Sequence, residues 1–208
     1  MYIILSVLIV GLVLFANEHH WRNKASQSEL SRKIIHIFVG SFVAFWPLYI
    51  SWDWIRIISL AFLFVVLISK GLNIFASIHE IERFSVGEVC FALAVGGITF
   101  ITKNDWIYVV ALLQMSLADG LAAIFGVRFG KSTMYKVFGA AKSLVGSATF
   151  LITSLLILII VSSLVNLGLS VVLILLTALA ATAVENFSVY GLDNLLIPIA
   201  VTLILSHW

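Results

Sequence analysis

Apolar residues occur in long uninterrupted runs along this chain, and short polar segments separate the runs. Eight runs stand out, at residues 1–16, 34–52, 54–69, 88–102, 106–129, 146–165, 169–189 and 192–208. A helix needs about 17–25 predominantly apolar residues to cross a bilayer core roughly 30 Å thick. The pattern therefore predicts an all-α bundle of about eight transmembrane helices, or seven if one of the shorter runs does not cross.

The apolar stretch from residue 146 to residue 189 is too long for one helix, because at about 1.5 Å per residue it would extend about 66 Å. It must fold back, and Asn166-Leu167-Gly168 is the predicted turn. The first run lacks the basic residues and the small-residue cleavage pattern of a signal peptide, so we expect a retained helix there.

Composition assigns the whole chain to the membrane class. Of its 208 residues 62% are hydrophobic, and 12 lysines and arginines stand against 10 aspartates and glutamates. A soluble domain has roughly 45–50% apolar and about 25% charged residues, so soluble, disordered and fibrous proteins are excluded. The single cysteine, Cys90, excludes an internal disulfide and a cysteine metal cluster. We expect residues 1–208 to form one integral-membrane domain.

Basic residues are distributed unevenly over the connections between the predicted helices. The connections after helices 1, 3, 5 and 7 hold ten lysines and arginines, whereas those after helices 2, 4 and 6 hold only Arg56 and Lys103. The positive-inside rule places the basic face in the cytoplasm. We therefore expect a multi-pass protein with both termini outside and with long polar cytoplasmic loops at 17–33, 70–87 and 130–145.

Asp119 lies far along the fifth apolar run, where a carboxylate costs roughly 2.5–3.5 kcal/mol on insertion scales. Such a residue usually faces a cavity or a cation, and the alternative is a protonated or hydrogen-bonded packing carboxyl. Gly120, Ala123, Gly126 and Gly130 continue a small-residue face of the same helix. Close helix packing explains this face, and close approach of a ligand is compatible with it.

The loop that follows is rich in cations and hydroxyls. It holds Arg128, Lys131, Ser132, Lys136, Lys142 and Ser143, with glycines between them. A polyphosphate bound with Mg²⁺ needs a carboxylate for the metal, cations for the oxygens and glycines for close backbone approach. The alternative is an ordinary basic cytoplasmic loop.

Three further polar clusters fall on the same predicted side of the membrane. They are Arg32, Lys33 and His36; Glu80, Glu82, Arg83, Ser85, Gly87 and Glu88; and Glu185, Asp193 and Asn194. Taken separately, they are explained by interfacial anchoring, by a solvated loop and by helix capping. Their coincidence on one face favours a functional site there.

The chain resembles the CTP-dependent lipid-alcohol kinases, which comprise dolichol kinase, phytol kinase and the CTP-using diacylglycerol kinases and are related to phosphatidate cytidylyltransferase-like membrane enzymes. The resemblance covers about residues 31–198. Its motifs are Arg32-Lys33-xx-His36; Glu82-Arg83-x-Ser85-x-Gly87-Glu88; Asp119-Gly120-x-Ala122-xxx-Gly126-xxx-Gly130-Lys131 followed by Lys142-Ser143-xx-Gly146-Ser147; and Glu185 with Gly191-x-Asp193-Asn194. The Asp119–Ser147 motif is the specific one. This chain is small for a dolichol kinase, which usually has additional helices.

The resemblance implies a kinase that uses CTP and Mg²⁺ to phosphorylate the hydroxyl of a polyprenol, dolichol, phytol or diacylglycerol. It implies Asp119 and Asp193 as metal ligands. The implied catalytic residues are Asp119, Lys131, Lys142, His36 and Glu185, with the general base open among His36, Glu88 and Glu185. The implied nucleotide contacts are Lys33, Arg83, Gly120, Arg128, Gly130, Ser143, Gly146, Ser147 and Asn194. The expected partners are a membrane lipid and a nucleoside triphosphate, and no nucleic acid.

Other functions are compatible with some of these residues. In a cytidylyltransferase, a lipid phosphate would attack the α-phosphorus of CTP and release pyrophosphate. A secondary transporter would use Asp119 and Glu185 as coupling residues, but the inverted repeats that favour a transporter are not visible. A haem or redox protein would need paired histidines inside helices, and only His36 comes close.

Overall fold

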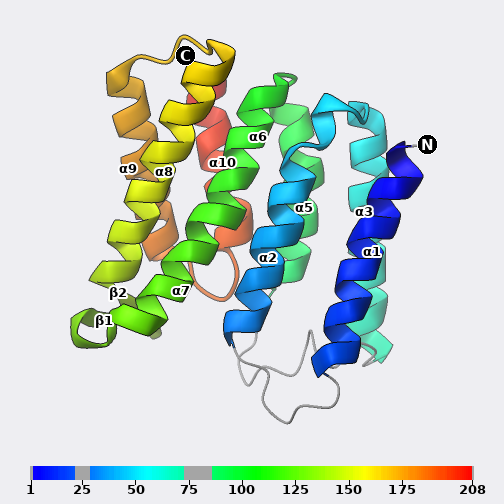
Figure 1. Cartoon of the computed structure of the whole chain (residues 1–208), viewed down its shortest axis with the longest axis horizontal. Coiled ribbons are helices and arrows are strands. Elements are labelled where there is room, and N and C mark those ends of the chain that lie inside the picture. The colour runs from blue at the N-terminus through cyan, green and yellow to red at the C-terminus, as the bar shows by residue number, and fades with distance from the viewer. Residues whose placement is uncertain (1, 22–28, 73–85, 208) are drawn as a thin grey trace.

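The computed structural model describes residues 2–21, 29–72 and 86–207, which form a bundle of helices that run up and down (Figure 1). The helices are α1 (Tyr2–Trp21), α2 (Glu29–Ala44), α3 (Trp52–Leu72), α5 (Gly87–Ile101), α6 (Asp105–Leu113), α7 (Asp119–Phe129), α8 (Leu144–Val165), α9 (Val171–Phe187) and α10 (Asp193–Ser206). Two short strands, β1 (Met134–Val137) and β2 (Ala140–Ser143), form an antiparallel hairpin between α7 and α8. The predicted all-α class is confirmed apart from this hairpin.

Every predicted apolar run contains a helix, and the fifth contains α6 and α7 joined by a π-helical turn at Gln114–Ala118. Among the described residues, three helical segments are long and apolar enough to cross a membrane: Trp52–Ser69, Asp105–Phe129 and Leu144–Val165. Four apolar helices are shorter, at Tyr2–Ala16, Gly87–Ile101, Val171–Phe187 and Asp193–Ser206. A multi-pass membrane protein is consistent with this pattern, and the count of eight crossings stays a prediction.

The second predicted helix, 34–52, differs most from the structure. Helix α2 begins five residues earlier, at Glu29, and ends at Ala44, after which Trp46–Leu48 form a 3₁₀ turn. Pro47 explains the early end, because its ring removes an amide donor and disfavours the helical conformation of the preceding residue. The apolar run continues past this break, so hydropathy alone extends the helix too far.

The predicted turn at Asn166-Leu167-Gly168 is confirmed. Asn166 adopts the left-handed conformation (φ 51°) that ends α8, and Gly168 also has a positive φ of 68°. Glycine and asparagine tolerate this conformation better than other residues. The Ser170 hydroxyl then accepts a hydrogen bond from the Leu173 amide and caps α9.

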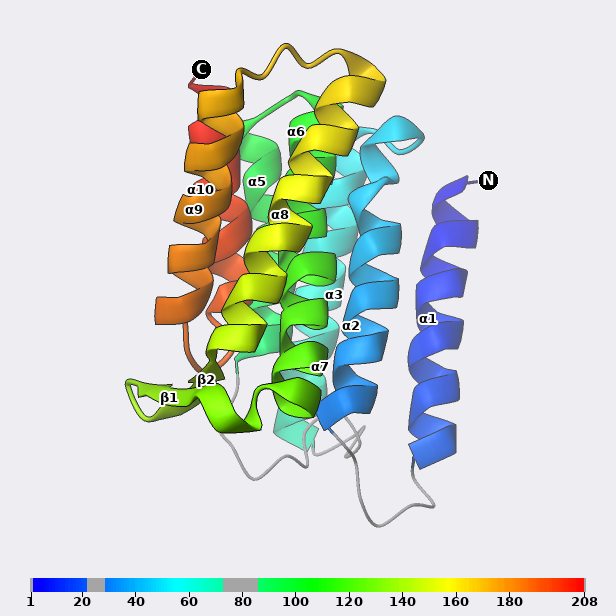
Figure 2. The ribbon, with the colours of Figure 1, turned by 60° about the vertical axis from the view of Figure 1, so that its left-hand side comes forward.

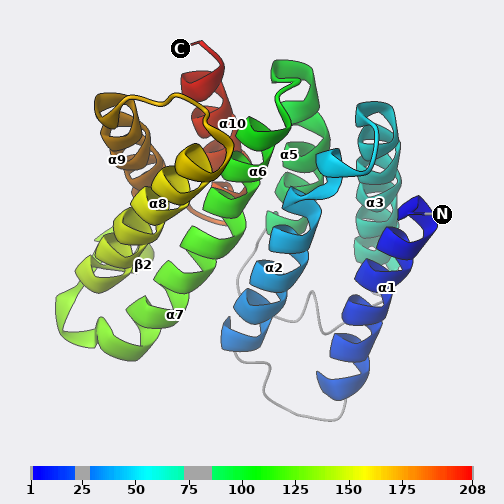
Figure 3. The ribbon, with the colours of Figure 1, turned by 45° about the horizontal axis from the view of Figure 1, so that its top comes forward.

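The continuous α6–α7 helix runs through the middle of the bundle, where α2, α8 and α10 pack against it. Helix α1 stands at the periphery beside α2 (Figure 2). Helix α1 begins and α10 ends at the same end of the bundle, the upper end in Figure 1. The hairpin and the α9–α10 connection lie at the opposite end, which we call the loop end; Figure 3 shows the hairpin joining α7 to α8 there.

Candidate functional site

Two ion pairs lie at the loop end of the bundle. Lys33 of α2 donates to the Asp119 carboxylate of α7 at 2.5 Å, and the two side chains are 13% and 5% exposed. Lys142 of β2 donates to the Glu185 carboxylate of α9, and also to the Glu185 backbone carbonyl at 2.7 Å. Four of the predicted site residues therefore form two buried pairs, although 86 and 43 positions separate the partners in sequence.

Asp193, the first residue of α10, connects the two pairs electrostatically. Its carboxylate interacts with the charges of Asp119, Lys33 and Lys142, and Glu185 also interacts with Asp119 and Asp193. We call Lys33, Asp119, Lys142, Glu185 and Asp193 the charged cluster. It brings together two lysines and three carboxylates, and the charge of Arg32 also acts on Lys33.

The π-helical turn sets the position of Asp119. The Asp119 amide donates to the Gln114 carbonyl five residues earlier, which widens the helix immediately before the carboxylate. π-Turns inside α-helices occur frequently at functional sites. His36 Nε2 lies 3.1 Å from the Met115 carbonyl of this turn. A carbonyl can only accept, so Nε2 carries a proton, and in a neutral ring Nδ1 is the nitrogen able to act as a base.

A polar network beside the charged cluster was not predicted from the sequence. The Tyr135 hydroxyl of β1 donates to Asn186 Oδ1 of α9 and lies 2.8 Å from the Ser147 hydroxyl of α8. Ser147 Oγ is itself 2.9 Å from Asn186 Oδ1. Ser147 was a predicted nucleotide contact, whereas Tyr135 and Asn186 were not singled out. A two-residue turn at Phe138-Gly139 was the signal in the sequence that could have identified Tyr135, because a hairpin closed by that turn places Tyr135 opposite Lys142.

The predicted small residues pack helices closely at this end. A Cβ atom on Gly120 would lie 2.2 Å from Ile37 Cγ1 of α2, and one on Gly130 would lie 2.4 Å from Ser143 Oγ. Gly146 of α8 approaches α7, since its Cβ would lie 3.1 Å from the Ala122 carbonyl. Close packing is thus confirmed for this face.

Ser143 caps α8 by accepting a hydrogen bond from the Gly146 amide at 3.1 Å. Asn194 donates to the Gly87 carbonyl at 2.9 Å and joins α10 to α5. These residues therefore have structural roles in the bundle. The nucleotide contacts predicted for them, and for Gly120, Gly130 and Gly146, stay predictions.

The remaining predicted residues lie outside the charged cluster. Lys131 is exposed on a 3₁₀ turn after α7, and exposed Arg128 lies with its guanidinium 5.5 Å from the Phe129 ring centre. Glu88 is half-buried in the first turn of α5. Arg83 lies outside the described residues, as do Glu80, Glu82 and Ser85.

The carboxylates of the charged cluster are suitable for a magnesium ion. Among the described residues, no group of three or more histidine, cysteine, aspartate or glutamate side chains is arranged to hold a metal. Mg²⁺ does not require one, because it is usually bound by one or two carboxylates together with water and substrate phosphates. Asp119 and Asp193 supply two carboxylates, and the buried Glu185 Oε2 atom has no hydrogen-bond partner within the described part of the chain. The residues therefore fit the predicted ion.

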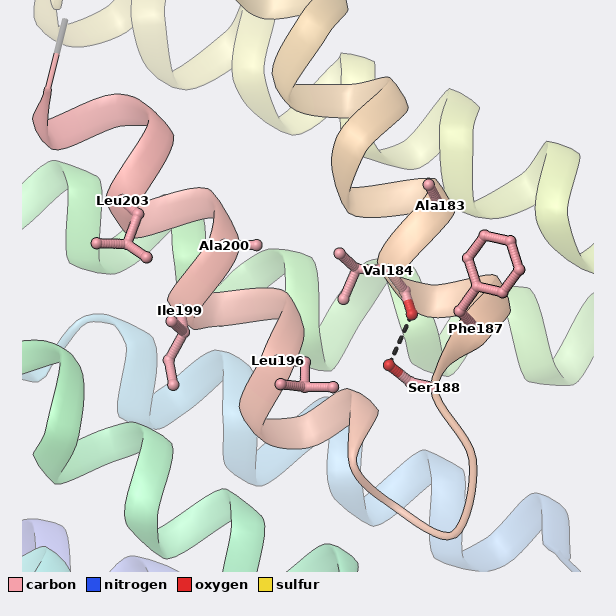
Figure 4. Close-up of a pocket in the computed structure, with 8 residues that line it drawn as sticks. All are labelled: Ala183, Val184, Phe187, Ser188, Leu196, Ile199, Ala200 and Leu203. Atoms are coloured by element: carbon pink, nitrogen blue, oxygen red, sulfur yellow. Dashed lines mark hydrogen bonds between the residues drawn. The ribbon is translucent and has the colours of Figure 1, made fainter. Parts of the chain in front are cut away.

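An apolar groove of about 400 Å³ lies between α9 and α10 (Figure 4). Its lining consists of Ala183, Val184, Phe187, Ser188, Leu196, Ile199, Ala200 and Leu203. The one polar side chain, Ser188, donates to the Val184 carbonyl at 2.6 Å, so its hydroxyl is satisfied internally. The surface that the groove presents is suited to hydrocarbon. The two helices that form it also carry Glu185 and Asp193.

Comparison with known proteins finds similar chains among kinases. The chain is 32% identical to the phytol kinase of Synechocystis sp., over 96% of this chain and 88% of that protein. It is 30% identical to a probable chloroplastic phytol kinase of Triticum aestivum, over 86% of this chain and 67% of that protein. It is also 31% identical to an uncharacterised protein of Rickettsia prowazekii over 56% of each chain. No family model and no solved structure matches the chain.

Proposed function

Because this chain belongs to the phytol kinase family, we propose that it transfers the γ-phosphate of CTP to the hydroxyl of a lipid alcohol at the cytoplasmic face of a membrane. The observation that carries the proposal is the charged cluster. Buried and half-buried ionisable side chains from α2, α7, β2, α9 and α10 converge at one end of an apolar bundle. Ionisable groups at such a position are rare in membrane proteins and mark functional sites.

The reaction forms one bond and breaks one bond. The alcohol oxygen attacks the γ-phosphorus, the bond from that phosphorus to the β–γ bridging oxygen breaks, and CDP leaves. The proton of the alcohol passes to a base. Phosphoryl transfer depends on positioning and on neutralisation of charge more than on covalent help from the protein. In this proposal Lys33 and Lys142 turn from their carboxylate partners toward the phosphate oxygens.

In this proposal Asp119 and Asp193 would hold Mg²⁺, which would supply neutralisation of charge on the phosphate oxygens. The carboxylates of the charged cluster support this assignment. Three of them converge on the two lysines, and a divalent cation held there would offset their repulsion of a nucleoside triphosphate.

Glu185 is the base that the geometry supports best. Its side chain is 7% exposed, one oxygen pairs with Lys142, and Oε2 has no hydrogen-bond partner among the described residues. His36 has one ring nitrogen engaged by the Met115 carbonyl. We assign His36 to orienting the turn that carries Asp119. Glu88 is set apart, at the start of α5.

The lipid alcohol is the substrate class that fits an active site at the end of a membrane bundle. Its hydrocarbon tail stays in the bilayer, where α9 and α10 present the apolar groove. Its hydroxyl reaches the charged cluster, and the nucleotide arrives from the aqueous side. Phytol is the first alcohol to test, because the two named relatives are phytol kinases.

A kinase assay with the purified full chain in lipid nanodiscs tests the proposal. CTP, ATP, GTP and UTP are each paired with phytol, a polyprenol and diacylglycerol. We expect label from γ-³²P-CTP, and not from α-³²P-CTP, to appear in the alcohol product. Transfer of the α-label together with release of pyrophosphate would identify a cytidylyltransferase instead. If no nucleotide yields a labelled lipid, the kinase proposal is wrong, and substrate transport becomes the function to test.

A further inference from the structure

One face of the hairpin carries the side chains that hydrogen-bond to α9. Tyr135 pairs with Lys142 in the register of β1 and β2. Side chains of directly paired residues lie on the same face of a two-stranded ribbon. Both are half-buried and contact α9, whereas Met134, Lys136 and Ala141 on the other face are exposed. The inward face thus carries one hydroxyl and one cation side by side.

A tight turn joins the two strands. Phe138 and Gly139 both have positive φ angles, 46° and 84°, as in the type I′ turn that suits a two-residue hairpin. An isolated two-stranded hairpin is nevertheless marginally stable at best. The position of Lys142 therefore depends on what holds the ribbon to the helices.

The Tyr135 side chain attaches the hairpin to the helices at a point next to the Lys142 contact. Its hydroxyl donates to Asn186 Oδ1 and lies 2.8 Å from Ser147 Oγ. The Asn186 amide group donates in turn to the Thr182 carbonyl at 3.0 Å, which orients its oxygen toward the hairpin. Asn186 directly follows Glu185 in the last turn of α9. The Tyr135–Asn186 and Lys142–Glu185 contacts are thus adjacent on one helix.

We propose that Tyr135 is a positioning residue for the phosphoryl transfer: its hydroxyl, held by Asn186 and Ser147, fixes the hairpin so that Lys142 points into the charged cluster. The role in phosphoryl transfer rests on the proposed function. The attachment of the hairpin to the helices rests on the hydrogen bonds alone. When nucleotide takes Lys142 from Glu185, the tyrosine keeps the strand in place.

Tyr135→Phe tests the inference, because it removes the hydroxyl and leaves the ring. A hydrogen bond contributes about 0.5–1.5 kcal/mol, so we expect the KM for CTP to rise about twofold to tenfold. The KM for the lipid alcohol is expected to stay unchanged. In the same variant, hydrogen–deuterium exchange of the segment 134–143 is expected to be faster in the absence of nucleotide. Lys136→Ala, on the exposed face of the same strand, is the matched control and leaves both measurements unchanged.

A double variant separates the attachment from an effect elsewhere. Asn186→Ala removes one of the two partners of the Tyr135 hydroxyl and leaves Ser147, so Tyr135→Phe is expected to raise hairpin exchange less in the Asn186→Ala background than in the wild type. Additive effects of the two substitutions would overturn the proposed partnership.

The two readouts also separate this inference from the proposed function. Unchanged hairpin exchange in Tyr135→Phe would overturn the attachment. Faster exchange with an unchanged KM for CTP would reduce the hydroxyl to a purely structural role and overturn the positioning. An inactive wild-type chain would overturn the kinase proposal and the positioning role in transfer, while hairpin exchange would still decide the attachment.

Discussion

Asp119 and Lys33 depend on each other, because each is the charge partner of the other in a mostly buried position. Asp119→Asn keeps the side-chain volume but removes the charge that Lys33 and a metal ion require. We expect the variant to lose phosphorylation, measured by transfer of γ-label. From the sequence alone, the variant is expected to stay folded and inserted, because it removes a charge that is costly to bury in a membrane. The observed pair changes this expectation, because breaking a buried pair costs about 3–5 kcal/mol through the charge left behind.

The combination of Asp119→Asn with Lys33→Gln is the control for folding. It removes both charges, so the unfolding temperature in detergent is expected to return toward that of the wild type while activity stays absent. Near-normal activity of the single variant Asp119→Asn would instead show that the carboxylate is a packing group.

Lys142 and Lys136 lie on opposite faces of the hairpin and so give a paired test of the phosphate role. Lys142 points to Glu185 and is mostly buried, whereas Lys136 is exposed. Lys142→Ala is expected to lower kcat/KM for nucleotide about a hundredfold to a thousandfold, by analogy with removal of an oxyanion donor. Lys136→Ala is expected to have little effect. Steady-state kinetics at varied CTP measures both.

Lys131→Ala belongs in the same series, since the sequence predicts a phosphate contact for Lys131 and the structure shows the residue exposed after α7. A loss comparable to that of Lys142→Ala would support the predicted contact. Small and equal effects of all three substitutions would identify a basic anchoring loop and contradict the phosphate role.

Helix contacts near the site leave no room for a side chain at Gly120. A Cβ atom there would approach Ile37 Cγ1 to 2.2 Å, so Gly120→Ala requires the Ile37 side chain, or α2 with it, to shift away from α7. Overpacking of this kind costs about 1–3 kcal/mol, and Lys33 and His36 move with α2. We expect a lower unfolding temperature together with lower activity. Thermal unfolding in detergent and the kinase assay measure the two effects.

Two further variants show whether the effect is steric. Gly97→Ala places a methyl group where no atom outside its own helical backbone and chain neighbours lies within 4 Å, so it should not lower stability. Adding Ile37→Ala to Gly120→Ala creates space for the new methyl group and should recover part of the stability. If Gly120→Ala is as stable as the wild type but binds CTP poorly, the glycine serves ligand approach and not packing.

At the scale of the whole molecule, orientation in the membrane is the property that the basic loops predict. Helix α1 begins and α10 ends opposite the loop end, as expected for an even number of crossings. We expect Asn166→Cys to react with an impermeant maleimide in intact cells and Thr133→Cys to react only after permeabilisation. The native Cys90 is 4% exposed, so we expect it to contribute little labelling by the maleimide. The reverse labelling would place the charged cluster on the wrong side for cytosolic nucleotide.

The sequence by itself determined the helices and the end of the bundle that carries the chemistry. Apolar run length and the Asn166–Gly168 turn are local properties, so the predicted ranges match the described helices closely, except where Pro47 ends α2 early. Alternation of the chain through the bundle then brings the connections after the first, third, fifth and seventh predicted helices to one end. The motif residues Lys33, Asp119, Lys142, Glu185 and Asp193 consequently meet there.

Only the tertiary structure decided which of these residues pair and what the small residues do. Lys33 reaches Asp119, and Lys142 reaches Glu185, because of how α2, α7, α9 and the hairpin are rotated and spaced. The π-helical turn, the hairpin and the Tyr135–Asn186 contact follow from the same packing. The physical reason is that hydropathy and motif spacing report the neighbours of a residue along its own helix. Contacts between helices depend on side-chain shapes contributed by segments far apart in the chain.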